Sequence, residues 1–192
     1  GHQFVLGRTI AEAVDKSLYG ANRRYRYTFD MLGEAALTGA DAERYLDAYR
    51  GAIGALRERV GEYAETAARP SVSVKLSALH PRFERPHRGR VLRELVPRLV
   101  GLCIDAREAG IALTLDAEES ERLEITLELL EAACNDPRLA GWNGFGLAVQ
   151  AYQKRAPAVL RWLIGLARDT GRILNVRLVK GAYWDAEIKR SQ

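Results

Sequence analysis

Charged and amide side chains stand at the ends of four apolar segments that alternate with helical stretches. Lys75 ends S-V-S-V-K, Asp116 and Gln150 end the next two segments, and Arg177 and Lys180 belong to the fourth. Lysine, arginine and aspartate are costly to bury unless they are paired or bind a ligand. A strand end can also be polar simply because it reaches solvent. For each of these residues taken alone, that alternative remains open. The series as a whole indicates a ligand site.

The first two strand ends predict an ion pair beside a cavity. Lys75 shares its expected strand face with Ser71 and Ser73, and small polar residues below a lysine favour a cavity over a packed core. Asp116 shares a face with Thr114 and could neutralise Lys75 across neighbouring strands.

The fourth segment is typical of a wall that holds a flat, partly anionic cofactor. It reads R-L-V-K-G-A-Y-W over residues 177–184. Arg177 is expected to point inward and Lys180 to lie at the turn, while Gly181 allows close backbone approach to a ligand. Gln150 offers a donor and an acceptor to a heteroaromatic ring. The alternative is a basic strand end with core aromatic residues.

The elements that must position these residues follow from hydrophobic periodicity. Strands are expected at residues 71–76, 111–116, 146–150 and 173–179. Helices are expected at residues 9–17, 25–37, 39–63, 92–109, 122–134, 156–170 and from 185 onward. The third of these helices opens with the capping signal T-G-A-D at Thr38.

This alternation predicts an α/β fold with parallel crossovers. Strands recur about every 30 to 40 residues, the size of one βα unit. In a parallel barrel, every strand would deliver its carboxyl end, and with it such residues, to one mouth. We expect residues 1–70 to form an N-terminal helical segment and residues 71–192 the first half of the barrel, about four βα units. No glycine-rich dinucleotide loop follows the first strand and no Walker A loop is present.

Composition and residue spacing indicate a globular protein and do not support a nucleic-acid or metal site. With 47% hydrophobic and 28% charged residues the chain is globular, and its net charge is +4. A basic cluster consists of Arg82, Arg85, Arg88, Arg90 and Arg93. We interpret it as a solvated loop and helix start, because no aromatic interleaving supports nucleic-acid binding. The cysteines and histidines lack metal-ligand spacing, so no metal site is predicted, and the reducing cytoplasm fits best.

Six ordered blocks resemble the proline dehydrogenase domain of the proline utilization A (PutA) family. They are D-M-L-G-E-A-A-L at 30–37, K-L-S-A-L-H-P at 75–81, D-A-E-E-S at 116–120, G-W-N-G at 141–144, Q-A-Y-Q-K-R at 150–155 and R-L-V-K-G-A-Y-W-D at 177–185. The resemblance implies a distorted (β/α)8 barrel that binds FAD. It also implies oxidation of L-proline to 1-pyrroline-5-carboxylate, with electrons passed to a membrane quinone. A covalently linked aldehyde dehydrogenase domain and a cytoplasmic location peripheral to the inner membrane are further expectations.

The resemblance assigns a role to each matching residue. The expected catalytic residues, in contact with proline or the hydride-accepting atom or guarding the entrance, are Lys75, Asp116, Arg177, Tyr183 and Glu34. Asp30 is a weaker candidate for the entrance role of Glu34. The expected FAD-binding residues are Asp116, Ala117, Gln150, Arg177, Val179, Lys180, Gly181, Ala182 and Trp184.

Length sets this chain apart from a full member of that family. A complete barrel takes on the order of 250 residues, so we expect a fragment that lacks the last strands and the substrate-binding arginine pair of the last helix. Alone it is expected to be inactive, with open edges at its first and fourth strands. Two alternatives remain: a non-catalytic fragment or interaction domain, and a Schiff-base lyase that uses Lys75 or Lys180.

Overall fold

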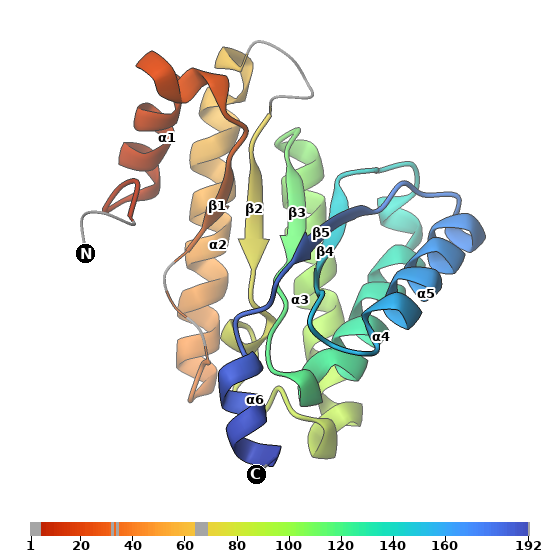
Figure 1. Cartoon of the computed structure of the whole chain (residues 1–192). Coiled ribbons are helices and arrows are strands. Elements are labelled where there is room, and N and C mark those ends of the chain that lie inside the picture. Colours follow the sequence, from red (N-terminus) through yellow and green to blue (C-terminus); the bar gives the residue numbers. More distant parts are fainter. Residues whose placement is uncertain (1–4, 32, 34, 64–68, 192) are drawn as a thin grey trace.

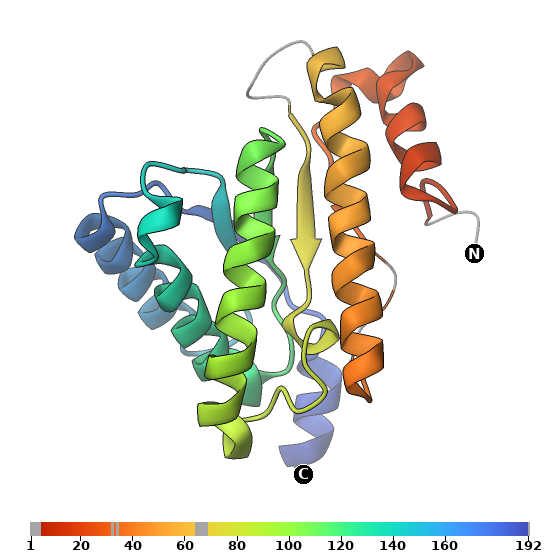
Figure 2. The same cartoon turned by 180° about the vertical axis from the view of Figure 1, so that it is seen from behind.

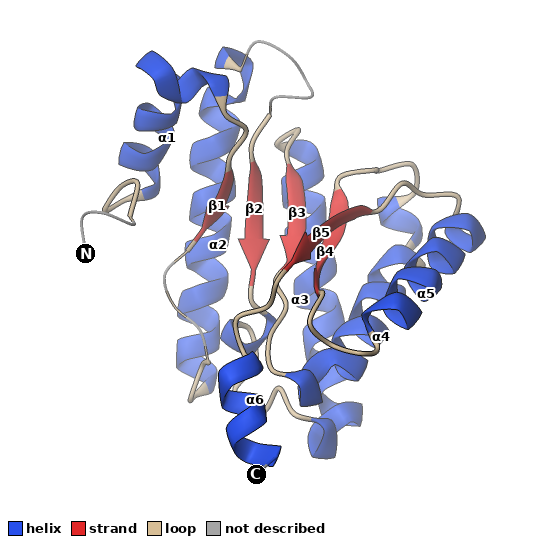
Figure 3. Ribbon diagram, viewed as in Figure 1, coloured by secondary structure: helices blue, strands red, loops and turns tan. Residues whose placement is uncertain are grey.

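A computed structural model describes residues 5–31, 33, 35–63 and 69–191 of the chain. Its centre is a parallel sheet with the strand order β1-β2-β3-β4-β5 (Figure 3). The strands are β1 (Thr28–Asp30), β2 (Ser71–Val74), β3 (Ala112–Leu115), β4 (Phe145–Gln150) and β5 (Asn175–Val179). Sequential parallel neighbours need a crossover between each pair, and a helix supplies each one.

The helices cover one face of this sheet and lie beyond one end of it. They are α1 (Ile10–Leu18), α2 (Gly39–Arg59), α3 (Arg88–Glu108), α4 (Leu123–Cys134), α5 (Ala156–Thr170) and α6 (Trp184–Ser191). Helices α2 to α5 lie along the same face of the sheet, which Figure 2 shows from behind. Helix α6 lies beyond the carboxyl ends of the strands (Figure 1). This order is the βα repeat of a TIM-type barrel, so the expected fold class is confirmed.

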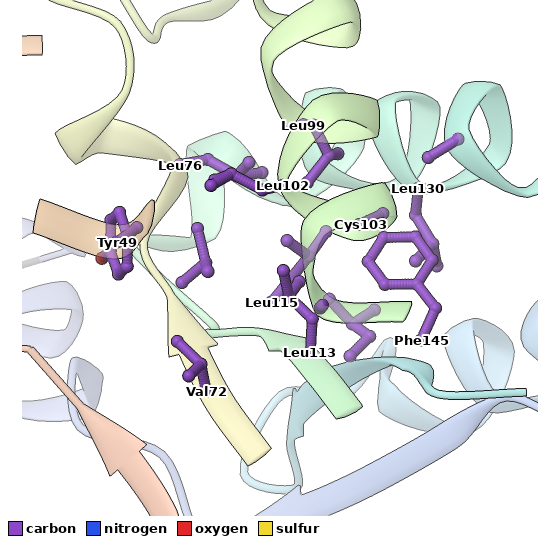
Figure 4. Packing of buried hydrophobic residues seen from close by; sticks show 14 of the residues in the cluster. Tyr49, Val72, Leu76, Leu99, Leu102, Cys103, Leu113, Leu115, Leu130 and Phe145 are labelled. Carbon is purple, nitrogen blue, oxygen red and sulfur yellow. The ribbon is translucent and has the colours of Figure 1, made fainter. Parts of the chain in front are cut away.

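The core forms where the helices meet the sheet. Val72 and Val74 of β2 and Leu113 and Leu115 of β3 have no exposed surface. They pack with leucines of α3 such as Leu99, as Figure 4 shows. Because strand side chains alternate between faces, the other face of the sheet carries the small and polar residues of the same strands. That face is therefore free to carry a site.

Local signals in the sequence set the helix starts as expected. The Thr38 hydroxyl accepts a hydrogen bond from the Asp41 backbone N–H at 3.1 Å, and the Asp41 carboxylate accepts one from the Thr38 N–H at 3.0 Å. This capping box begins α2 at Gly39. Thr9 caps α1 in the same way, through the Glu12 N–H at 3.2 Å. The helices expected at 9–17, 92–109, 122–134 and 156–170 are confirmed with small shifts at their ends.

The helix expected at residues 25–37 is wrong. Thr28 to Asp30 instead form β1, with Thr28 opposite Ser71 and Asp30 opposite Ser73. Phe29 between them is buried, so pairing and burial in the fold outweigh the helical preference of the flanking residues. Asp30 therefore ends a strand and shares no helix face with Glu34, which lies outside the described residues.

The strand count and the sheet edges change with this correction. Within the described residues the sheet has five strands, and the strand expected first is second in order. The open edge expected at that strand is therefore wrong, because β1 covers it. Among the described residues β5 is the last strand of the sheet, in agreement with the open edge expected there. Its outward side chains Val176 and Leu178 are 41% and 59% exposed. The domain boundary at residue 70 stays a prediction, although β1 lies before it and pairs with β2 after it.

Two absences concern only the described part of the chain. There, no helix is both long and apolar enough to cross a membrane. No group of three or more histidine, cysteine, aspartate or glutamate side chains is arranged to hold a metal ion within the same residues.

Candidate functional site

The carboxyl ends of β2, β3 and β5 bring three predicted site residues together. The Lys75 ammonium lies 3.2 Å from one carboxylate oxygen of Asp116, and the Arg177 guanidinium donates to the other. Asp116 is thus the anion shared by two cations, as predicted for Lys75. In these three side chains, exposure is 11% for Asp116, 16% for Lys75 and 38% for Arg177. A partly buried cluster of this kind holds its charges in place before any ligand arrives.

Two further contacts complete the charge balance of the cluster. Lys75 donates to both carboxylate oxygens of Asp30, at 2.9 and 3.0 Å. Arg177 donates to the Ser73 hydroxyl at 2.9 Å and so reaches from β5 across the inner face of the sheet to β2. Two cations therefore meet two carboxylates. The resemblance names Asp30 only as a candidate for the entrance role of Glu34, so its contact with Lys75 is a finding of the structure.

The Lys75 amine is held in its charged form. Burial alone would lower its pKa, but the hydrogen bond to Asp30 and the charge of Asp116 outweigh that effect and raise the pKa above its ordinary value. A Schiff-base lysine must react as the neutral amine. The raised pKa therefore disfavours the lyase alternative at Lys75 and favours a role in binding an anion.

Tyr49 of α2 supports Lys75 from the helix side of the sheet, which sequence reasoning missed. Its phenol oxygen accepts a hydrogen bond from the Lys75 backbone N–H at 3.1 Å. The tyrosine is 2% exposed, and burial raises its pKa to about 12. In the sequence Tyr49 is indistinguishable from the other apolar positions of the α2 stripe, so no local signal marks it.

Gln150, at the end of β4, is buried with half of its amide unused. Its Nε2 donates to the backbone carbonyl of Glu118 at 2.9 Å. Its Oε1 has no hydrogen-bond partner within the described structure. A buried acceptor without a partner is uncommon in folded proteins, and a water, an ion or a ligand donor would satisfy it. Ala117 lines the same small cavity as Gln150, together with residues of α4 and α5, and its role in cofactor binding stays a prediction.

Gly181 follows β5 at a position that no other residue fits. Its φ is +117°, a region that favours glycine. A Cβ there would stand 3.0 Å from Gln150 Oε1 and would clash with the Tyr152 ring. The missing side chain thus lets the Tyr152 ring pack against the Gly181 backbone, beside Gln150 Oε1. Close approach of a ligand at Gly181 stays a prediction.

The remaining predicted residues frame the same end of the sheet. The Val179 and Lys180 carbonyls accept from the backbone N–H groups of Ala151 and Tyr152, at 2.8 and 3.2 Å. The Lys180 ammonium lies 5.6 Å from the centre of the Trp184 ring, a cation–π contact. Two residues are less defined as site members: Tyr183 is half-buried and Ala182 is exposed. Glu34 lies outside the described residues, so its expected role stays a prediction.

Most of the basic cluster around the start of α3 is paired with carboxylates in the described structure. Three of its arginines pair with carboxylates: Arg85 with Glu124 at 3.0 Å, Arg88 with Glu128 at 2.6 Å, and Arg90 with Glu94 at 2.8 Å. This pairing supports the interpretation as a solvated, charge-balanced surface. The absence of nucleic-acid binding stays a prediction.

Comparison with known proteins places this site in a family. A family model described as proline dehydrogenase matches residues 14–192. The chain belongs to the proline dehydrogenase family. All five carboxyl-end residues described first above, Asp30, Lys75, Asp116, Gln150 and Arg177, lie within the matched region.

Individual relatives agree with this assignment. The chain is 53% identical to the bifunctional protein PutA of Escherichia coli over 192 residues, which is 100% of this chain and 14% of that protein. It is 29% identical over 184 residues to proline dehydrogenase 1 of Bacillus subtilis, covering 94% of this chain and 52% of the relative. The chain therefore spans only part of the length of the curated relatives it matches.

Solved structures show the same relationship. A mutant of PutA from Bradyrhizobium japonicum matches 97% of this chain and 19% of its own, with a TM-score of 0.85 and 53% identity. PutA from Bdellovibrio bacteriovorus, inactivated by N-propargylglycine, matches 99% of this chain and 21% of its own, with a TM-score of 0.92 and 27% identity.

Proposed function

We propose that this chain forms the carboxylate-binding and flavin-facing half of an enzyme that oxidises L-proline to 1-pyrroline-5-carboxylate with FAD. The observation that carries the proposal is the Lys75–Asp116–Arg177 cluster at the carboxyl ends of the strands, in a chain of the proline dehydrogenase family. Active sites of TIM-type barrels lie at this face.

The residues present fit a flavin ring. Its polar edge needs hydrogen-bond partners, and Gln150 Oε1 is a buried acceptor without one in the described part of the chain. Its flat face needs close backbone approach, which a residue without a side chain, Gly181, would allow. Arg177 would supply positive charge beside the electron-accepting part of the ring, with Lys180 and Trp184 further along the cofactor. The flavin, when bound, supplies the two-electron acceptor.

The chain's own residues would bind and orient the substrate. The Lys75 ammonium, kept charged by Asp30 and Asp116, would bind the proline carboxylate. Fixing the carboxylate fixes the position of the carbon that loses hydride, which is the orientation part of catalysis. Asp116 holds Lys75 and Arg177 in one geometry, so substrate and cofactor sites would share one support. Arg177 would stabilise negative charge that develops on the ring.

Wider roles belong to the same proposal. The relatives named as bifunctional PutA proteins support a covalently linked aldehyde dehydrogenase domain in the full-length gene product. A membrane quinone as electron acceptor, and a cytoplasmic location peripheral to the inner membrane, complete the proposed setting.

The test uses the full-length gene product. We expect a yellow protein with bound FAD that reduces a quinone analogue when given L-proline. Lys75→Met should raise the KM for proline roughly 10- to 100-fold, because a charge-assisted contact of about 1.5–3 kcal/mol is lost. Lys154→Met, at an exposed lysine, is the matched control. A folded, colourless full-length protein without this activity would overturn the proposal and favour a non-catalytic interaction domain.

A further inference from the structure

A second buried carboxylate, that of Glu118, ties together the loops that follow β2, β3 and β4. Its side chain is 3% exposed. One carboxylate oxygen accepts a hydrogen bond from the Ser77 backbone N–H at 3.0 Å, and the other accepts from the Arg122 guanidinium at 2.9 Å. The backbone carbonyl of Glu118 accepts from Gln150 Nε2 at 2.9 Å. One residue thus touches three strand ends.

Such a carboxylate is not needed to fill space. Burial raises the pKa of Glu118, and only the hydrogen bonds from Ser77 and the charge of Arg122 oppose that penalty. An apolar side chain of similar size would avoid the cost altogether. The contacts of Glu118 therefore point to a role in fixing positions rather than in filling the core.

The contact with Gln150 determines which half of its amide faces the site. A flipped amide would set Oε1 against the Glu118 carbonyl, two acceptors facing each other. Nε2 is therefore held on Glu118, and Oε1 is turned away from Glu118, toward Gly181. There Oε1 is buried and unpartnered as far as the described residues extend. Gln150 thus presents an acceptor and no donor.

We propose that Glu118 is a positioning residue. The Glu118 carboxylate accepts from the Ser77 N–H and so fixes the loop after β3. The Glu118 backbone carbonyl in that loop then holds Gln150 Nε2, which keeps Oε1 facing the cofactor. This inference rests on the proposed function, since the partner of Oε1 is taken to be the flavin. The oxidised flavin ring has one N–H, at N3. Gln150 Oε1, a hydrogen-bond acceptor, would pair with that N–H.

The test compares FAD with 3-deaza-FAD, in which a C–H replaces the N3–H. Dissociation constants are measured by flavin fluorescence on the apo form of the full-length gene product. The wild type should bind 3-deaza-FAD about tenfold more weakly, the loss expected for one buried hydrogen bond. Glu118→Ala should reduce this ratio to under about twofold. Circular dichroism shows whether each variant is folded.

Matched variants separate positioning from a general loss of structure. Glu118→Asp keeps the charge but is too short for Ser77, so it should also lose the discrimination. Glu118→Gln keeps an acceptor for the Ser77 N–H and should retain most of it. Glu119→Gln, in the same loop and 3.2 Å from the same arginine, should behave as wild type.

Two results would overturn the inference. One is a folded Glu118→Asp protein that still discriminates tenfold, and the other is a wild type that binds both compounds equally. A wild type that binds neither compound would instead overturn the proposed function, so the two failures are distinguishable.

Discussion

Asparagine in place of Asp116 removes the negative charge that Lys75 and Arg177 share, with almost no change in volume. Lys75 would keep its contacts with Asp30. Arg177 would keep its hydrogen bond to the Ser73 hydroxyl. The variant therefore leaves two cations with one carboxylate, and that carboxylate is 53% exposed.

The size of the effect follows from burial. A hydrogen bond between charged groups contributes about 1.5–3 kcal/mol, and two of them are weakened. Arg177 is 38% exposed, so solvent screens part of its interaction, and the asparagine oxygen still accepts one bond. We expect a loss of about 2 kcal/mol in the free energy of unfolding. For a chain of this size that corresponds to a Tm lower by about 4–8 °C.

Urea and thermal unfolding, followed by far-ultraviolet circular dichroism at pH 7, measure this loss. Glu128→Gln is the control, because it breaks an ion pair with Arg88 whose side chains are 33% and 55% exposed, and its shift should be much smaller. An Asp116→Asn protein as stable as the wild type would refute the reasoning, because the carboxylate would then hold neither cation.

Three further predictions concern pH and backbone strain. Burial raises the pKa of Tyr49 from 10.0 to about 12, so its contribution to stability is complete below pH 10 and is lost as pH rises toward 12. Tyr49→Phe should flatten this alkaline loss of stability, measured by urea unfolding. The same variant leaves the Lys75 N–H unpaired, which costs about 1–3 kcal/mol at pH 7. Burial lowers the pKa of His80 below 6.5, so its contribution to stability is present above pH 6.5 and is lost as pH falls. His80→Asn should flatten the acid side of the plot of unfolding free energy against pH. An acid side that does not change would contradict this prediction. Gly181→Ala places a Cβ against the Tyr152 ring at a φ of +117°. It should lower the Tm and weaken FAD binding at least about tenfold, measured by fluorescence titration. Equal FAD affinity would show that the cofactor does not approach Gly181.

Much of the site was predictable from strand periodicity. Because the carboxyl ends of parallel strands lie at one edge, the order of Lys75, Asp116, Gln150 and Arg177 along the sequence already implied that they meet. The start of α2 was predictable for a different reason. The capping box at Thr38 is formed by residues that are close in sequence, so its pattern can be read locally.

Other features could not be predicted, because they depend on contacts distant in sequence. The three residues of β1 are extended only through pairing with β2, and a strand that short leaves no periodic pattern. Tyr49 has its role through the Lys75 N–H, 26 residues away. Glu118 acts on Gln150 through a backbone carbonyl, a group that every residue has and that no side-chain pattern reveals.

The hydrogen bond from Arg177 to Ser73 has a consequence for the order in which the site forms. It joins residues 104 positions apart, so most of the chain must be synthesised and docked before it can close, and closing so long a loop costs entropy. Lys75 and Asp116 are made earlier and can pair first. During translation the guanidinium would then complete a charge cluster that already exists. Under the proposed function, cofactor capture would follow as a late event, and flavin uptake would then report completed folding.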